Sequence, residues 1–484
     1  MPLFSRDRIA PLVHLSNNWI SLTGVVIVTT ATVFWLFLLP FTLRGEITHP
    51  YIGILAFLLL PGLFILGLIL IPVGIVLRRR RDRERGQVPA SFPPLNWQNT
   101  DFRRLAIFVV ATTVLNLIIT SQFAYGAVNY MDTTTFCGLT CHRVMDPEYT
   151  GHRNSAHARV DCVACHIGPG ASWFVRSKLS GTGQVFATLF NTYPRPIPTP
   201  VQNLRPARET CEVCHWPQRF EFDRLEVIPE YAEDAVNTPT KTVLLMKIGG
   251  GGGTLAGIHG AHVGQNIHIR YAASDAARQT IPWVEYTDAR GKATVYTVSG
   301  TKTPDQANIR EMDCIDCHNR PSHPFQPADR ALNAAMAAGN IPAALPFIKK
   351  QALQIVQQSY SSKEDADQKI PAAIESFYRT NYAGLYLQYR NQVRKAAEGV
   401  LAVYNDNVFP DMRITWGTYP DNIGHMDSPG CFRCHDGNHA SAGGQTVTQD
   451  CGACHNVVAV QEPNPKILTD LGIGSNETSV PDPR

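Results

Sequence analysis

Six short motifs, each with two cysteines and a following histidine, constrain this 484-residue chain more than any other feature. Five have the form Cys-x-x-Cys-His and lie at 162–166, 211–215, 314–318, 431–435 and 451–455. The remaining motif, at 137–142, reads CGLTCH and has one extra residue between its cysteines. The six motifs use all 12 cysteines, so the fold is built around repeated copies of one kind of site.

The Cys-x-x-Cys-His pattern is typical of covalent attachment of c-type haem. The two thiols form thioethers with the porphyrin vinyl groups, and the adjacent histidine becomes the proximal ligand of the iron. Zinc sites also pair cysteines, but they do not require a histidine after every second one. Disulfides across two intervening residues, each followed by histidine, would be an unusual framework even in an oxidising compartment. The sequence therefore predicts six haem c groups.

The predicted attachment residues are Cys137, Cys141, Cys162, Cys165, Cys211, Cys214, Cys314, Cys317, Cys431, Cys434, Cys451 and Cys454. The predicted proximal ligands of the five standard motifs are His166, His215, His318, His435 and His455.

Three long runs near the N-terminus, residues 18–42, 52–77 and 105–128, are apolar and contain no charged residue. A helix needs about 20 apolar residues to cross a bilayer, so each run is long enough. A cleaved signal peptide is a poor interpretation of the first run, because its apolar stretch is too long and no small-x-small site follows it. We predict three transmembrane helices.

The positive charges predict the orientation of these helices. The sequence RRRRDRERG begins at Arg78, and Arg103 and Arg104 precede the third run, whereas the loop 43–51 carries only Arg44. The positive-inside rule therefore places 78–104 in the cytoplasm and everything after the third helix on the outer side. The predicted location is the bacterial inner membrane, with several spans and a periplasmic haem domain, which agrees with where c-type haem is attached.

The expected fold class is mainly α. Three transmembrane helices precede a periplasmic multihaem cytochrome c domain with little regular structure, a small β-rich insert and a helical segment. The predicted parts are a two-span membrane hairpin with a cytoplasmic basic loop (1–104), a third transmembrane helix that anchors the domain (105–128), a three-haem module (129–218), a β-rich insert (219–310), a C-terminal three-haem module with a helical segment (311–464) and a polar tail (465–484).

Local patterns predict the secondary structure of the soluble part. Residues 242–248 and 267–273 have strand character, and 284–298 form two alternating strands around an Asp-Ala-Arg-Gly turn. Residues 328–405 have helical spacing and predict two or three helices, broken near Pro342, Pro346 and Pro371.

The distal ligands of the irons should come from the histidines outside the motifs. Haems that only transfer electrons are usually six-coordinate, and eight spare histidines lie on the haem side of the membrane. The favoured distal ligands are His157, His259, His262, His425 and His439, with His323 as a further candidate, whereas His152 and His268 are not expected to bind iron. A histidine a few residues from a motif, such as His439, cannot easily reach across its own porphyrin and should serve a neighbouring haem.

With these residues in view, the chain resembles the NapC/NirT family of membrane-anchored multihaem quinol dehydrogenases. Within that family it is most similar to the larger inner-membrane cytochromes of metal-respiring bacteria. The stretches that carry the resemblance are CGLTCHRVMDPEYTGHRNSAHARVDCVACHIGPGASWFVRSKLSG and NTYPRPIPTPVQNLRPARETCEVCHWPQRF, with a looser match in CIDCHNRPSHPF and IGHMDSPGCFRCHDGNH.

The resemblance implies a special role for the first haem, which in the family lies at the membrane surface and accepts electrons from menaquinol or ubiquinol. In some members its proximal ligand is a methionine just after the motif. Met145 is therefore a candidate that competes with His142, and ordinary packing of Met145 against the porphyrin is an equal alternative. Cys137 lies only nine positions after Val128, which independently keeps this site close to the bilayer.

The resemblance also implies where the quinol binds. The aromatic and basic segment 173–190 suits a membrane interface. Lys178 matches a family lysine that hydrogen-bonds the quinone oxygen, or it contacts lipid headgroups instead. We assign Arg176 to the same site. Some relatives shield the first haem with an aspartate, which this segment lacks, and Gln184 is the substitute.

We therefore predict a quinol dehydrogenase that passes electrons from the membrane quinol pool to periplasmic or outer-membrane c-type cytochromes. The alternative is an electron-relay and structural subunit of a larger respiratory complex, with other subunits of that complex as partners. A terminal reductase would need an open distal position, and the spare histidines argue against it. The net charge of +3 is too small to indicate a nucleic-acid partner.

Overall fold

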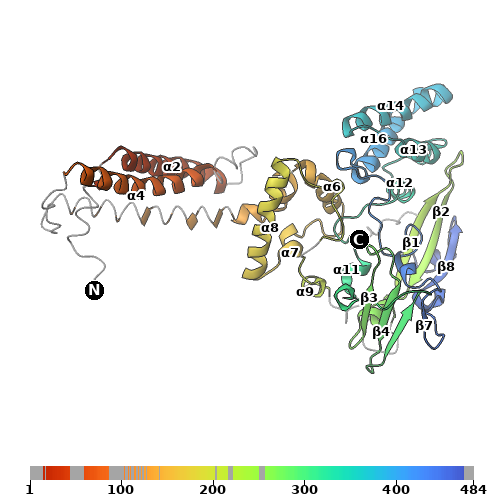
Figure 1. Ribbon diagram of the computed structural model, residues 1–484. Coiled ribbons are helices and arrows are strands. Elements are labelled where there is room, and N and C mark those ends of the chain that lie inside the picture. Colours follow the sequence, from red (N-terminus) through yellow and green to blue (C-terminus); the bar gives the residue numbers. More distant parts are fainter. Residues whose placement is uncertain are drawn as a thin grey trace. The chain divides into compact units, whose positions relative to one another are not determined.

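The chain divides into two compact units, Met1–Phe136 and Cys137–Arg484 (Figure 1). The computed structural model describes residues 15–16, 18–43, 59–86, 128–140, 142–201, 204–215, 222–249 and 257–473, and isolated positions between 103 and 126. The boundary between the units falls directly before the first cysteine motif. The finer limits predicted from the sequence within each unit stay a prediction.

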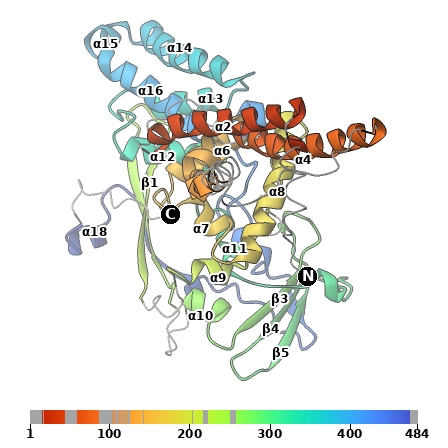
Figure 2. The same cartoon turned by 90° about the vertical axis from the view of Figure 1, so that its left-hand side faces the viewer.

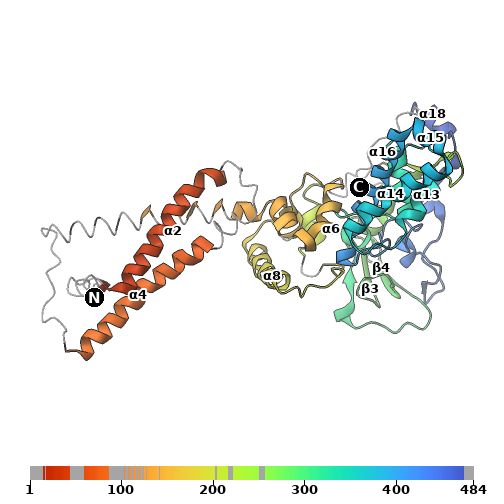
Figure 3. The same ribbon diagram turned by 90° about the horizontal axis from the view of Figure 1, so that it is seen from above.

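The N-terminal unit contains two apolar helices that pack together, α2 (Trp19–Leu43) and α4 (Leu60–Glu84) (Figure 3). Their backbones approach closely at two glycines. A Cβ on Gly24 would lie 2.7 Å from the carbonyl oxygen of Gly67, and a Cβ on Gly67 would lie 2.8 Å from that of Gly24. Such small-residue contacts are typical of helices that associate in a membrane.

Within the described residues, α4 is the helix that is long and apolar enough to cross a bilayer, with a mean hydropathy of 2.6. The described side chains of α2 form a shorter apolar helix, Trp19–Thr32. Most of the third predicted span, 105–128, lies outside the described residues. The positions of it that are described are helical, and Ile107, Val110 and Ile118 among them are exposed.

The second unit contains two antiparallel sheets. One has the order β1-β2-β8, with β1 (Arg224–Tyr231), β2 (Pro239–Met246) and β8 (His455–Glu462). The other has the order β6-β3-β4-β5-β7, with β6 (Arg310–Glu311), β3 (His268–Ala272), β4 (Trp283–Thr287), β5 (Ala293–Thr297) and β7 (Ala440–Ser441). The strands β2 and β3 and the β4–β5 hairpin are confirmed. The strands β7 and β8 belong to the C-terminal part of the chain, after the cysteines of the fifth and sixth motifs. Each pairs with a strand of the predicted insert, so both sheets contain strands from both regions.

Five helices between the fourth and fifth motifs build the largest apolar core (Figure 2). They are α12 (Ala328–Ala337), α13 (Ile348–Val356), α14 (Lys363–Asn381), α15 (Ala383–Gln388) and α16 (Arg390–Asn407). Pro342 and Pro346 lie between α12 and α13, as predicted. The predicted break at Pro371 is wrong, because this proline lies inside α14. The buried face formed by Ile370, Ile374 and Tyr378 continues across it, so packing outweighs the single hydrogen bond that proline removes.

The five standard cysteine motifs form short helical turns in the second unit. The turns are α7 (Cys162–His166), α9 (Ala207–Cys211), α11 (Cys314–Cys317), η6 (Gly430–Arg433) and α17 (Cys451–Cys454). Aspartates cap two of them. Asp313 accepts a hydrogen bond from the Ile315 amide, and Asp450 accepts one from the Gly452 amide. Because a cap fixes where a turn begins, it also fixes the direction of the two thiols.

Candidate haem sites

Each of the five standard motifs has a second histidine ring facing its own. The ring centroids are separated by 6.2 Å for His166 and His323, 5.8 Å for His215 and His157, 6.2 Å for His318 and His259, 5.8 Å for His435 and His262, and 6.2 Å for His455 and His425. An imidazole nitrogen lies about 2.0 Å from a bound first-row metal, so two imidazoles on one metal have centroids roughly 6.2 Å apart. The observed spacings therefore fit an iron between each pair.

Backbone carbonyls orient four of the facing histidines. The Nδ1 atoms of His259, His262 and His323 lie 2.8 Å from the carbonyl oxygens of Ile248, Ile258 and Glu148. The Nδ1 atom of His157 lies 3.1 Å from the carbonyl oxygen of Pro321. A carbonyl can only accept, so Nδ1 carries the proton and Nε2 keeps its lone pair for a metal.

Burial keeps several of these rings in the neutral form. Desolvation is the main cause of the lowered pKa of five histidines, namely His166, His259, His262, His318 and His323. A histidine must be neutral to donate its lone pair to a metal, so the environment of these rings favours ligation. His425 is held differently, because its ring stacks on Phe432 with centroids 4.3 Å apart.

The structure gives His439 a different position from the one predicted. Its side chain is 1% exposed, with Nδ1 2.7 Å from Asp436 Oδ1 and Nε2 2.6 Å from the carbonyl oxygen of Ile281. Both ring nitrogens are therefore occupied by protein acceptors, and neither is left for an iron. This arrangement could not be predicted locally, because the second partner, Ile281, comes from the distant segment that leads into β4.

His152 and His268, the other two spare histidines after residue 128, are not expected from the sequence to bind iron. His268 Nδ1 lies 2.8 Å from Glu311 at an exposed position, and His152 Nε2 lies 2.9 Å from the carbonyl oxygen of Val160. One nitrogen of each ring is thus bonded to the protein, whereas His152 Nδ1 is buried without a hydrogen-bond partner among the residues that the structure describes.

One short helix serves two motifs at once. His259 and His262 lie three residues apart on α10 (Gly257–Val263), and they face His318 and His435 respectively. In the same way, His323 follows the fourth motif in sequence but faces the ring of the second, His166. These exchanged partners tie the segments around different motifs into one structure.

Neighbouring motifs also lie side by side. The turn α7 packs against α9, and α9 packs against α11, where the Cys211 and Cys314 thiols lie close to each other. Burial raises the pKa of the Cys317 thiol to about 12, and the nearby Cys431 thiol raises it further. The same Cys431 contributes to the raised pKa of Cys454, after burial. The second to sixth motifs therefore follow one another in space in chain order.

The first motif has a different local structure. Residues Phe136–Thr140 form a π-helical turn, and the helix α6 (His142–Arg153) follows. Cys141 and the side chain of His142 lie outside the described residues. Met145 is half-buried and lies one turn further along α6, on the same side of the helix as position 142. Both candidate ligands thus project from one helix.

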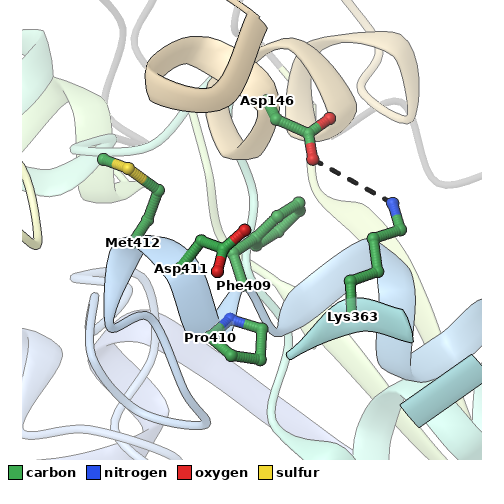
Figure 4. Close-up of a pocket in the computed structure, with 6 residues that line it drawn as sticks. All are labelled: Asp146, Lys363, Phe409, Pro410, Asp411 and Met412. Carbon is green, nitrogen blue, oxygen red and sulfur yellow. Dashed lines mark ion pairs between the residues drawn. The ribbon is translucent and has the colours of Figure 1, made fainter. Parts of the chain in front are cut away.

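The helix α6 is anchored by the C-terminal part of the unit. Val144 packs with Phe409 and Met412 in a buried cluster, and Asp146 lies 4.0 Å from Lys363 across a small pocket that Figure 4 shows. These contacts hold the helix that carries Met145 against the C-terminal part of the unit.

The predicted quinol residues lie on α8 (Ala171–Leu189) but are not brought together. Arg176 lies over the Trp173 ring at 5.1 Å, and Lys178 lies over the Phe174 ring at 4.9 Å. Successive helical residues are about 100° apart around the axis, so Arg176 and Lys178 lie on nearly opposite sides of α8. Gln184 lies on a side of the helix that differs from both.

Lys178 lies within a broad exposed apolar face of α8. The exposed large apolar residues of this helix and its C-cap are Phe174, Val175, Leu179, Val185, Phe186, Leu189 and Phe190. An apolar face of this size with one basic residue in it suits the boundary between headgroups and acyl chains.

Sequence reasoning missed two charged residues inside the motifs, Asp316 and Arg433, which lie in a polar network between the fourth and fifth motifs. The available signal was that a charge occupies one of the two positions between the cysteines in both motifs.

Comparisons with known proteins agree with this reading of the motifs. Residues 99–196 match the family model described as the NapC/NirT cytochrome c family, N-terminal region. The chain is 41% identical over 458 residues to the cytochrome c-type protein ImcH of Geobacter sulfurreducens, and the alignment covers 92% of this chain and 89% of that protein. No solved structure matches the chain.

Proposed function

Because the chain belongs to the NapC/NirT family of c-type cytochromes, and so carries covalently bound haem and transfers electrons, we propose that it is a hexahaem quinol dehydrogenase. It oxidises menaquinol, or another quinol, at the periplasmic face of the inner membrane. It passes the electrons to periplasmic or outer-membrane c-type cytochromes.

The observation that carries this proposal is the place of the first motif in the chain. The motif directly follows the segment 105–128, whose described positions are helical and expose apolar side chains. A quinol is confined to the bilayer, so the redox site nearest the lipid is its natural electron acceptor. The eight residues between Val128 and Cys137 cannot carry that site far from the interface.

In the proposed topology 18–42, 52–77 and 105–128 each span the membrane. The hydropathy of α4 and the close contact of α2 with α4 support the first two spans. The arginines from Arg78 to Arg85 extend α4 on the cytoplasmic side, where anionic lipids attract them. The haem-bearing unit then lies in the periplasm.

We assign the five facing histidines as distal ligands of the second to sixth haems. His323, His157, His259, His262 and His425 then complete the sites of His166, His215, His318, His435 and His455. The haems supply one-electron acceptors, and the protein fixes their ligands, burial and spacing. Two imidazoles on each iron keep its coordination unchanged when it gains or loses an electron.

At the first site, Met145 and His142 are the candidate proximal ligands. Lys178 donates a hydrogen bond to a quinol oxygen from within the apolar face of α8, where the aromatic rings of Phe174 and Phe186 accommodate the apolar part of the quinol. Arg176 and Gln184 lie on other sides of the helix. Their proposed roles are contact with headgroups and cover for the first site.

The test is reduction of the purified chain, alone in lipid vesicles, by a menaquinol analogue, with dithionite defining complete reduction. We expect the quinol to reduce haem in the wild type. In K178M the KM for quinol should rise about tenfold, because a hydrogen bond from a charged group contributes roughly 1.5–3 kcal/mol. K350M removes an exposed lysine from α13 and should leave the KM unchanged.

The alternative, an electron-relay and structural subunit, predicts a different result. In that case the chain has its full haem content and is reduced by dithionite, but it is inert to quinol until other subunits of the complex are added.

A further inference from the structure

A buried carboxylate lies inside the fourth motif. Asp316, between Cys314 and Cys317, has a side chain that is 2% exposed. Its Oδ1 accepts hydrogen bonds from the Tyr271 hydroxyl at 2.6 Å, from Arg278 Nη1 at 3.1 Å and from Arg310 Nε at 3.1 Å. Its Oδ2 accepts one from the Asp313 amide at 2.8 Å. Two arginines therefore compensate a charge that would otherwise be costly to bury.

A cation occupies the equivalent loop of the fifth motif. Arg433, between Cys431 and Cys434, donates to three carbonyl oxygens: Nε to Gly430 at 2.9 Å, Nη1 to Arg278 at 2.9 Å and Nη2 to Asp316 at 2.6 Å. Within the described part of the chain it makes no ion pair with a carboxylate. Its guanidinium is thus fixed by neutral groups, and its full positive charge remains between the two motifs.

The position of Arg433 places this charge at both motifs. Arg433 lies between Cys431 and Cys434 of the fifth motif, and its Nη2 atom donates to the carbonyl oxygen of Asp316, which lies between Cys314 and Cys317 of the fourth. These cysteines are the attachment points of the proposed fourth and fifth haems. The guanidinium therefore lies between the two proposed haem sites.

We propose that Arg433 and Asp316 form a charged bridge that sets the reduction potentials of the fourth and fifth haems. This inference rests on the proposed six-haem function. A fixed cation favours the haem that has gained an electron, so Arg433 raises both potentials. The buried carboxylate of Asp316 offsets the positive charge of the neighbouring arginines and therefore lowers both reduction potentials. Both residues are positioning residues, because they act through the field at the haems.

The two residues make opposite predictions. In R433Q the equilibrium constant for reduction of two of the six haems should fall roughly tenfold, which corresponds to about 59 mV for one electron. In D316N the arginines lose their counter-charge, so the same two haems should become easier to reduce. A merely structural role would disturb both variants in the same direction.

The experiment is a spectroelectrochemical titration of the purified holoprotein, with the haem content of each variant measured first. R433K keeps the charge and should restore most of the wild-type curve. R394Q removes an exposed arginine of α16 that pairs with Glu398, and it should leave the curve unchanged. The proposal is overturned if R433Q and D316N shift the curve in the same direction, if neither shifts it, or if R433K behaves as R433Q.

Failure of this inference is distinguishable from failure of the proposed function. A wild-type protein with fewer than six haems, or one that quinol cannot reduce, contradicts the proposed function. A six-haem protein that quinol reduces, but whose curve ignores both substitutions, contradicts only the charged bridge.

Discussion

The first motif and the five that follow it differ in how the protein completes the site around them. Each standard motif has a facing histidine with ring centroids 5.8 to 6.2 Å apart. We propose that these five sites use five of the eight spare histidines that follow residue 128. The other three, His152, His268 and His439, are hydrogen-bonded to the protein. In the proposed ligand set the first motif differs, because its candidate ligands, His142 and Met145, both come from its own helix α6.

This difference suggests a division of labour along the chain of haems. Five sites with two imidazoles are suited to passing electrons with little change in structure. The first site combines an enlarged cysteine loop, a π-helical turn and a nearby methionine with a place in the chain shortly after the apolar segment 105–128. Such a site is suited to meeting a substrate, and the proposed quinol is the substrate that the bilayer supplies.

The largest expected effect comes from removing the first haem. In the double variant C137A/C141A, reduction by quinol should be abolished, because electrons lose their entry point, while dithionite still reduces the remaining haems. Absorbance at the reduced haem band after each reductant measures this. The matched variant C451A/C454A removes the last haem and should keep reduction by quinol. Equal loss of quinol reduction in both variants would contradict the comparison.

A smaller effect, confined to one site, is expected when a facing histidine is removed. H259A should convert one haem from low spin to high spin, because its iron loses the second imidazole. Electron paramagnetic resonance of the oxidised protein counts the low-spin haems. H268A removes an exposed histidine paired with Glu311 and is the control. An unchanged number of low-spin haems in H259A would contradict the assignment of His259 as the distal ligand of the fourth haem.

The attachment sites could be read from the sequence because thioether chemistry is encoded within a few residues. Strands and most helices could also be predicted, since alternation and helical spacing are local patterns. Pro371 is the instructive exception, because tertiary packing of Ile370 and Ile374 continues a helix that the local rule ends.

The pairing of rings could not be read in the same way. His323 faces His166, and His262 faces His435, across long separations that only the fold determines. His439 shows the limit of counting candidates. The number of spare histidines favoured it as a ligand of a neighbouring haem, but its ring nitrogens bond to Asp436 and to the carbonyl of Ile281. Sequence alone does not reveal that a distant carbonyl occupies a nitrogen.

A still smaller effect, a change in the absorption spectrum of one haem, should identify the proximal ligand of the first haem. Position 142 and Met145 are three residues apart on α6, so either side chain can be presented to one iron, but not both from the same side. We expect one of the variants H142A and M145L to alter the ferric absorption spectrum of this haem and the other to leave it unchanged. The measurement is best made in C451A/C454A protein, where fewer haems overlap. A change in both spectra, or in neither, would contradict a single proximal ligand from α6.

The smallest redox effect is expected for the substitution of His439. This variant distinguishes histidines that bind iron from histidines that stabilise the fold. H439A should leave the number of low-spin haems and the titration curve unchanged. It should lower the free energy of unfolding by about 1–3 kcal/mol, because it leaves the carbonyl of Ile281 and the carboxylate of Asp436 without a buried donor. Thermal unfolding followed by circular dichroism measures the loss, and spin counting on the same sample measures the haems. For H425A we expect the opposite result, the loss of one low-spin haem, because the His425 ring faces His455. A lost low-spin haem in H439A would mean that the ring leaves both hydrogen bonds to bind iron when haem is present.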